Sequence, residues 1–144
     1  MDGRGVFRGF ALQNVDAKGR VAIPYALRQT IELNSQVKTA VVAKLGKSDG
    51  LTGYDRNFLP EAGDRNENRI NFGLTEEANY DDSGRMVIPP MLRKLGKIEN
   101  LAFFIGTGER FEIWNPAIAL ASDEIDDDVK EIIRFCLEDK GITL

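Results

Sequence analysis

The residues best suited to chemistry in this 144-residue chain are two pairs of oppositely charged side chains. Asp16 and Arg20 enclose the tripeptide AKG, and Asp81 and Arg85 enclose DSG. A short carboxylate can accept hydrogen bonds from the backbone that follows it, and a glycine permits a positive φ, so both stretches favour tight turns. The expected structural turn residues are Asp16, Gly19, Asp81 and Gly84.

The arginines at the ends of these turns have two interpretations. Arg20 begins a short apolar stretch, and because its guanidinium is charged we expect it to lie outside the hydrophobic core. In the first interpretation it simply pairs with Asp16 in a weak surface contact. Alternatively it could bind nucleic acid, because arginine contacts phosphates and guanine edges through paired hydrogen bonds. The basic residues of the N-terminal half that could share one face with it are Arg8, Lys18 and Arg28. Composition and spacing do not decide between the two interpretations.

The two stretches belong to an internal repeat. At a constant offset of 65, nine of the 22 positions between 7 and 28 are identical to their counterparts. The identical positions in the first copy are Phe7, Asn14, Asp16, Gly19, Arg20, Ile23, Pro24, Leu27 and Arg28. A duplication on this scale predicts two equivalent supersecondary units.

Each unit has the pattern strand, turn, strand, short helix and hairpin. In the first copy we expect a strand over 7–15 and a helix over 25–31. In the second we expect a helix over 90–96 and a hairpin closed by the glycine-rich turn GTGE. Asn115 followed by Pro116 predicts a helix start, and the apolar spacing within 123–140 predicts an amphipathic helix.

A unit of this size cannot bury its apolar face alone, so we expect the two units to pack together. The predicted fold class is mainly β with short helices (α+β), in which the units form an intrachain pseudo-dimeric barrel followed by a C-terminal helix. Two independent tandem modules are the alternative. The expected segments are repeat 1 (7–54), a connector (55–71), repeat 2 (72–120) and an acidic C-terminal helix (121–144), which packs on its own barrel or on a neighbouring subunit.

Composition argues against an enzyme or a metal protein. The chain has no histidine, the commonest general base and transition-metal ligand, and its one cysteine, Cys136, suits a reducing compartment. The GTG of residues 106–108 lacks the lysine and long helix of a phosphate-binding loop. The acidic run Asp126–Asp128 is typical of a solvated helix start. We expect no catalytic residue, no metal and no cofactor.

The net charge of −4 conceals a basic N-terminal half. Residues 1–50 carry +4, residues 51–115 carry −3 and residues 116–144 carry −5. A polyanion responds to the local field, so the first half remains suited to nucleic acid. Neither a membrane-length apolar run nor a signal peptide is evident, which predicts a cytoplasmic protein that does not bind membranes.

The repeated phrases DAKGRVAIP…LR and DDSGRMVIP…LR resemble the AbrB-type swapped-hairpin motif. Their tandem arrangement, the opening FRG and the closing GERFEIWNP are similar to the MraZ family, bacterial regulators encoded at the head of the division and cell-wall gene cluster. The resemblance covers residues 7–54 and 72–120. The second copy departs from the first at Asp82 and Ser83, and the connector lacks the tryptophan-bearing helix usual in the family.

The resemblance implies a nucleoid-associated transcriptional regulator. Family members form rings, bind short direct repeats of double-stranded DNA upstream of their own operon, and usually repress it. The Asp-x-x-x-Arg signature of their DNA-facing surface falls on Asp16–Arg20 and Asp81–Arg85. The full set of expected DNA-binding residues is Arg8, Lys18, Arg20, Arg28, Arg85 and Arg93. The alternative is an AbrB-fold protein-interaction module of the antitoxin type.

Overall fold

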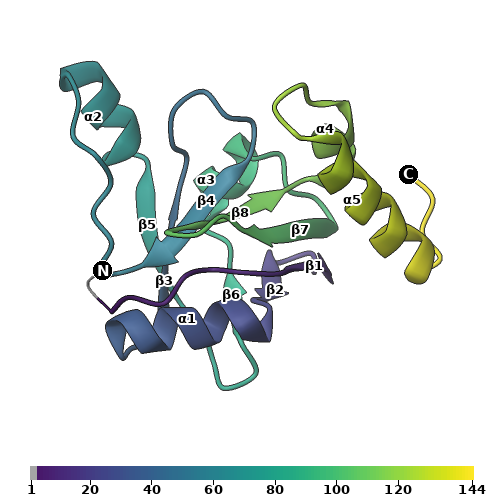
Figure 1. Ribbon diagram of the computed structural model, residues 1–144, viewed down its shortest axis with the longest axis horizontal. Helices are drawn as coiled ribbons and strands as arrows, with labels where there is room; N and C mark the ends of the chain where they lie inside the picture. The colour runs from purple at the N-terminus through teal and green to yellow at the C-terminus, as the bar shows by residue number, and fades with distance from the viewer. Residues whose placement is uncertain (1–2) are drawn as a thin grey trace.

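The two halves of the chain fold into the same series of elements. The structure is a computed structural model in which residues 3–144 are described (Figure 1). The first half contains β1 (Phe10–Asn14), β2 (Arg20–Ala22), α1 (Tyr25–Ser35), β3 (Thr39–Ala43) and β4 (Leu51–Asp55). The second contains β5 (Thr75–Asn79), β6 (Arg85–Val87), α3 (Pro90–Leu95), β7 (Leu101–Gly106) and β8 (Phe111–Trp114). Helix α2 (Arg65–Asn71) joins them, and α4 (Pro116–Ala121) and α5 (Asp127–Asp139) complete the chain.

Strands of the two halves are interleaved in one six-stranded antiparallel sheet. Its order is β1-β7-β8-β4-β3-β5, and β2 pairs separately with β6. Exchanging the halves and reading the order backwards gives the same sheet, which is the mark of a pseudo-twofold axis. The central pair of the small ribbon, Val21 opposite Met86, is its own counterpart under this exchange. The predicted mainly β fold with intrachain pairing of the two repeats is therefore confirmed.

The six-stranded sheet does not close into the expected barrel. Among residues 3–144, strands β1 and β5 each pair with one neighbour only, so the sheet has two free edges. The β2–β6 ribbon lies across the open side, where it contacts β1 and β5. Val21 and Met86 point inward and are buried with Val42 and Phe104 of the main sheet. Side-chain packing, rather than continuous hydrogen bonding, thus closes the core.

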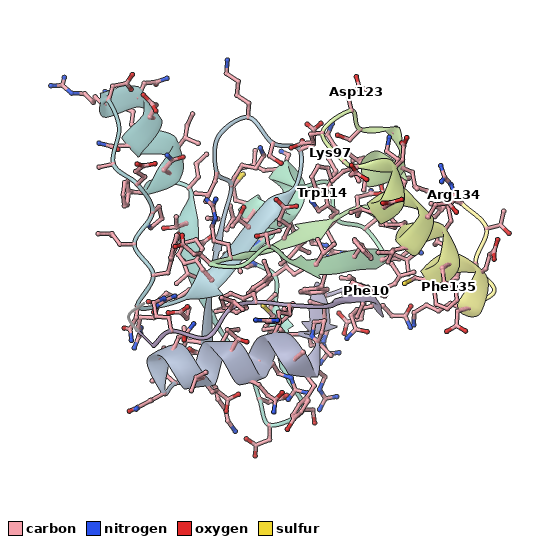
Figure 2. All side chains as sticks on the ribbon, viewed as in Figure 1. Phe10, Lys97, Trp114, Asp123, Arg134 and Phe135 are labelled. Carbon is pink, nitrogen blue, oxygen red and sulfur yellow. The ribbon has the colours of Figure 1, made fainter. Side chains whose placement is uncertain are left out.

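A second apolar cluster holds the C-terminal helices. The indole of Trp114 is 1% exposed and lies in the same cluster as Ile133 and Leu137 of α5 (Figure 2 labels Trp114). Leu12 of β1 and Phe103 of β7 complete the sheet side of this cluster. Of the two positions expected for the acidic helix, packing on its own sheet is therefore the one observed. None of the helices in residues 3–144 is both long and apolar enough to cross a membrane.

Several element boundaries differ from the sequence-based expectations. Gly9 has φ +91°, and the first strand begins only after it, at Phe10. Helix α1 runs four residues past position 31 before Gln36 ends it in the left-handed conformation. The connector contains helix α2, which starts with a capping box between Asp64 and Glu67. Asp126 caps α5, so that helix starts at Asp127 rather than at 123.

Candidate nucleic-acid interface

The two Asp-to-Arg turns have almost the same geometry. Asp16 Oδ1 accepts hydrogen bonds from the backbone N–H groups of Lys18 (3.0 Å) and Arg20 (2.8 Å). Gly19 has φ +82°, and its N–H donates to the carbonyl of Asp16 at 2.9 Å. Asp81 Oδ1 accepts from the N–H groups of Ser83 (3.0 Å) and Arg85 (2.9 Å). In the second turn Gly84 has φ +83°. Each aspartate therefore holds its own turn.

The turns deliver two arginines to the outer face of the β2–β6 ribbon. Because Val21 and Met86 face the core, the alternation of a strand turns Arg20 and Arg85 outward. Their side chains are 55% and 62% exposed. Arg20 stands opposite Val87, so the two arginines are diagonal neighbours about 7–8 Å apart at their Cα atoms. Both line one hollow of about 350 Å³.

Ion pairs orient these arginines. Arg20 Nε donates to Asp16 Oδ2 at 2.6 Å, and Arg85 Nε donates to Asp81 Oδ2 at 3.3 Å. Hydrogen bonds from the Arg20 backbone and side chain lower the pKa of Asp16, and the Arg85 backbone N–H is the main cause of the lowered pKa of Asp81. Both carboxylates remain ionised at neutral pH. Within residues 3–144 the terminal Nη groups of the two arginines make no hydrogen bond and can accept a ligand.

Arg28 and Arg93 occupy a different kind of position. Arg28 Nε donates to the carbonyl of Ile23 at 3.0 Å, and its Nη1 approaches the carbonyl of Asp82, in the turn of the other half, at 3.5 Å. Arg93 Nε donates to the carbonyl of Ile98 at 3.0 Å, and its Nη1 reaches Ala17, again in the opposite turn, at 3.4 Å. Each half thus braces the turn of the other.

The remaining candidates lie on either side of the ribbon. Lys18 is exposed at the tip of the first turn. Arg8 is exposed on the N-terminal segment, where it lines a hollow beside α1 with Gln29 and Leu33 rather than the hollow of the ribbon arginines. The structure therefore brings Arg20 and Arg85 together, with Lys18 at the adjoining turn and Arg8 further away.

Comparison with known proteins gives the family. The family model described as "MraZ protein, putative antitoxin-like" matches residues 72–118. "Transcriptional regulator MraZ" of Maridesulfovibrio salexigens is 33% identical over 141 residues, which cover 90% of this chain and 95% of that protein. The protein of the same name from Shewanella sediminis is 31% identical over 121 residues, covering 76% and 80%. The chain belongs to the MraZ family.

The likeness to solved structures is weaker. The solution structure of PHS018 from Pyrococcus horikoshii aligns with 80% of this chain and all of its own, at 18% identity and a TM-score of 0.34. A likeness of this size carries no argument, so the description of this MraZ-family fold rests on its own strand pairing. The curated MraZ relatives are named as regulators, not as enzymes, in agreement with the expectation of a non-enzyme.

Sequence reasoning missed one charged partner of the second turn. In this MraZ-family chain Lys38 Nζ pairs with Asp82, and the hydrogen bond to that carboxylate raises the pKa of Lys38. The extra negative charge of the second turn is thus compensated by a lysine of the first half. The two residues are 44 positions apart, and only the strand pairing that brings β3 beside β5 reveals the contact.

Proposed function

We propose that this MraZ-family protein is a sequence-specific DNA-binding transcriptional regulator whose contact surface is the outer face of the β2–β6 ribbon. The observation that carries the proposal is the pair of exposed arginines, Arg20 and Arg85, on one face of the ribbon. The major groove of B-DNA admits a two-stranded ribbon, and arginine is the commonest reader of guanine there. The names of the curated relatives support the regulatory role.

The candidate residues divide into two roles in this proposal. Arg20 and Arg85 contact base edges or phosphates through their Nη groups, because their Nε atoms already bind the turn aspartates. Lys18 and Arg8 supply further contacts to phosphates. Arg28 and Arg93 contribute indirectly by holding the turns, since their guanidiniums bind backbone carbonyls.

Binding by one subunit would be modest and strongly dependent on salt, because a single ribbon offers few cationic contacts. We propose that a ring of subunits overcomes this by engaging several short direct repeats at once, which raises the effective concentration of each further contact. Repeats about 10 base pairs apart would present the same side of the duplex. The protein would then act in the cytoplasm, at the nucleoid, as a repressor of its own operon in the division and cell-wall gene cluster.

An interaction module of the antitoxin type is the second candidate. It is favoured by the wording of the matching family model, "antitoxin-like". The distinguishing observation is a protein that co-purifies with the chain in fixed stoichiometry from its own cells. A stoichiometric partner, combined with equal affinity for the native and a scrambled duplex, would favour this candidate over the regulator.

The test of the DNA-binding proposal is a fluorescence-anisotropy titration with the duplex upstream of the protein's own gene. We expect tighter binding to this duplex than to a scrambled one, and Arg20→Ala should weaken specific binding about 5- to 150-fold, as for the loss of one bidentate base contact. Arg134→Ala on α5 removes the same charge from another exposed arginine and is the matched control. Unchanged affinity of Arg20→Ala would refute the assignment.

A further inference from the structure

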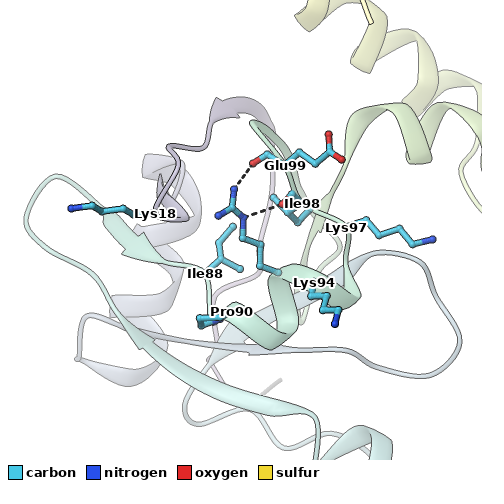
Figure 3. Close-up of a pocket in the computed structure, with 8 residues that line it drawn as sticks. Lys18, Ile88, Pro90, Lys94, Lys97, Ile98 and Glu99 are labelled. Atoms are coloured by element: carbon cyan, nitrogen blue, oxygen red, sulfur yellow. Dashed lines mark hydrogen bonds between the residues drawn. The ribbon is translucent and has the colours of Figure 1, made fainter.

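A basic hollow of about 430 Å³ lies beside the first turn (Figure 3). Lys18 reaches it from the first half of the chain, whereas Lys94 and Lys97 reach it from helix α3 and the segment that follows. Its floor is apolar, since Ile88 and Ile98 are 1% and 4% exposed. Residues of both halves of the chain therefore line the hollow.

The charges around this hollow are strongly unbalanced. Its lining holds the four cations Lys18, Arg93, Lys94 and Lys97, and the single carboxylate of Glu99. Arg93 is fixed by hydrogen bonds from its Nε to the carbonyl of Ile98 and from its Nη2 to the carbonyl of Glu99. Within residues 3–144 the ammonium groups of the three lysines enter no ion pair. Figure 3 shows the three ammonium groups pointing away from one another, so they are available to separate phosphates rather than to a single anion.

The pseudo-twofold axis provides an internal comparison. At the offset of 65, Lys18 corresponds to Ser83 and Lys94 to Gln29. Lys97 corresponds at this offset to Glu32. None of the three lysines is thus matched by a cation at the corresponding position of the opposite flank.

The opposite flank is also electrically balanced. Of its cations, Arg28 is held by backbone carbonyls, and Lys38 is paired with Asp82. Its remaining carboxylate, Glu32, accepts a hydrogen bond from the hydroxyl of Tyr80 at 2.8 Å. Because the lysines of the basic hollow enter no such ion pair within residues 3–144, pairing inside the fold does not explain why they stand on this flank.

The basic hollow is continuous with the ribbon surface. A third hollow runs along the first turn and connects the other two. Asp16 lines both this third hollow and the hollow of the ribbon arginines, whereas Arg93 and Glu99 line both the third hollow and the basic hollow. A duplex lying on the ribbon would thus meet Lys18 first and then Lys94 and Lys97 on one side only.

We propose that this basic hollow binds the phosphodiester backbone of DNA on one side of the ribbon, so that the protein contacts more phosphates on that side of its site than on the other. The proposal rests on the proposed function and extends it to Lys94 and Lys97.

The first experiment tests the flank without any assumption about sequence. The affinity for a nonspecific 30-base-pair duplex is measured by anisotropy at several salt concentrations. Each lost phosphate contact lowers the magnitude of the negative slope of log affinity against log salt by about 0.9, so Lys94→Gln/Lys97→Gln should lower that magnitude by about 1 to 2. The control, Lys47→Gln/Lys140→Gln, removes the same charge from two other exposed lysines and should leave the slope unchanged. Equal slopes for the two double variants would overturn the proposal.

The second experiment locates the contacted phosphates on the duplex upstream of the gene. Ethylation of phosphates should interfere with wild-type binding on one side of each contacted DNA repeat. Lys94→Gln/Lys97→Gln should remove that asymmetry. Gln29→Lys/Ser83→Lys should create interference on the other side. Symmetric interference in the wild type would refute one-sided phosphate contact. If the wild-type protein binds this duplex no more tightly than a scrambled one, while the variants show the expected salt slopes on the nonspecific duplex, the sequence-specific function is refuted. The proposal that the basic hollow binds phosphates is then still supported.

Discussion

The two turn glycines offer a sharp test of the arginine braces, because their surroundings differ although their backbone conformations agree. A methyl group at Gly19 would lie 3.4 Å from Nη1 of Arg93, an ordinary contact distance. A methyl group at Gly84 would lie 2.4 Å from Nε of Arg28 and 2.7 Å from its Cζ. Arg28 would have to swing away from the second turn, whereas Arg93 could stay at the first.

The magnitudes follow from the contacts. Alanine at either position takes a left-handed conformation, which costs about 1–2 kcal/mol. In Gly84→Ala the displaced Arg28 also loses its hydrogen bond to the carbonyl of Ile23, 3.0 Å long, which is worth about 0.5–1.5 kcal/mol. Its 3.5 Å contact with Asp82 is too long to add much. We therefore expect Gly84→Ala to lower the free energy of unfolding by about 1 kcal/mol more than Gly19→Ala does.

Urea unfolding followed by the fluorescence of Trp114, the only tryptophan in the chain, measures both variants. The double-mutant cycle with Arg28→Ala isolates the coupling. In the Arg28→Ala background the excess cost of Gly84→Ala should vanish, while Arg93→Ala should leave the cost of Gly19→Ala nearly unchanged. Equal costs for the two glycine substitutions in the wild-type background would show that the brace by Arg28 contributes no stability.

Two further predictions concern the acid limit of the turns and the C-terminal helix. The pKa values of Asp16 and Asp81 lie below the ordinary 3.8 in the folded chain. The interactions of these carboxylates therefore stabilise the fold above pH 3.8, and this stabilisation is lost as the pH falls through the folded pKa values. Carboxyl-carbon NMR titrations with midpoints at or above 3.8 would contradict this prediction. Ile133→Ala removes a fully buried side chain from the cluster that contains Trp114. It should lower the free energy of unfolding by about 2–5 kcal/mol and change the tryptophan emission of the folded protein. An unchanged urea midpoint would show that α5 is not coupled to the sheet.

The repeat was the most informative part of the sequence for the fold. Nine identities at one offset predicted two equivalent units, and the small size of each predicted that they would share a core. The signals for α4 were local as well, since Asn115 accepts hydrogen bonds from the backbone N–H groups of Ala117 and Ile118 at the helix start. Helix α2 also had a local signal, the spacing of Asp64 and Glu67, which the polar composition of the connector obscured.

Side-chain interactions over long sequence distances could not be predicted in this way. The barrel stays open because β1 and β5 meet the β2–β6 ribbon through side chains instead of pairing with each other. The residue type and position of Arg28 and Arg93 predicted contacts with nucleic acid. Their hydrogen bonds to backbone carbonyls in the turn of the opposite half could not be predicted, because the partners are far away in the sequence.

The sequence by itself determined the duplication, which a comparison at one fixed offset reveals. It also determined the chemistry of the two turns and of the arginines that leave them, because each turn depends on residues within five positions of one another. The tertiary structure alone decided which cations act together. It paired Lys38 with Asp82 on one flank and gathered Lys18 with Lys94 and Lys97 on the other. The physical reason is that strand exchange between the halves places the turn of one unit against the helix of the other, and electrostatic interactions depend on distance in space rather than along the chain.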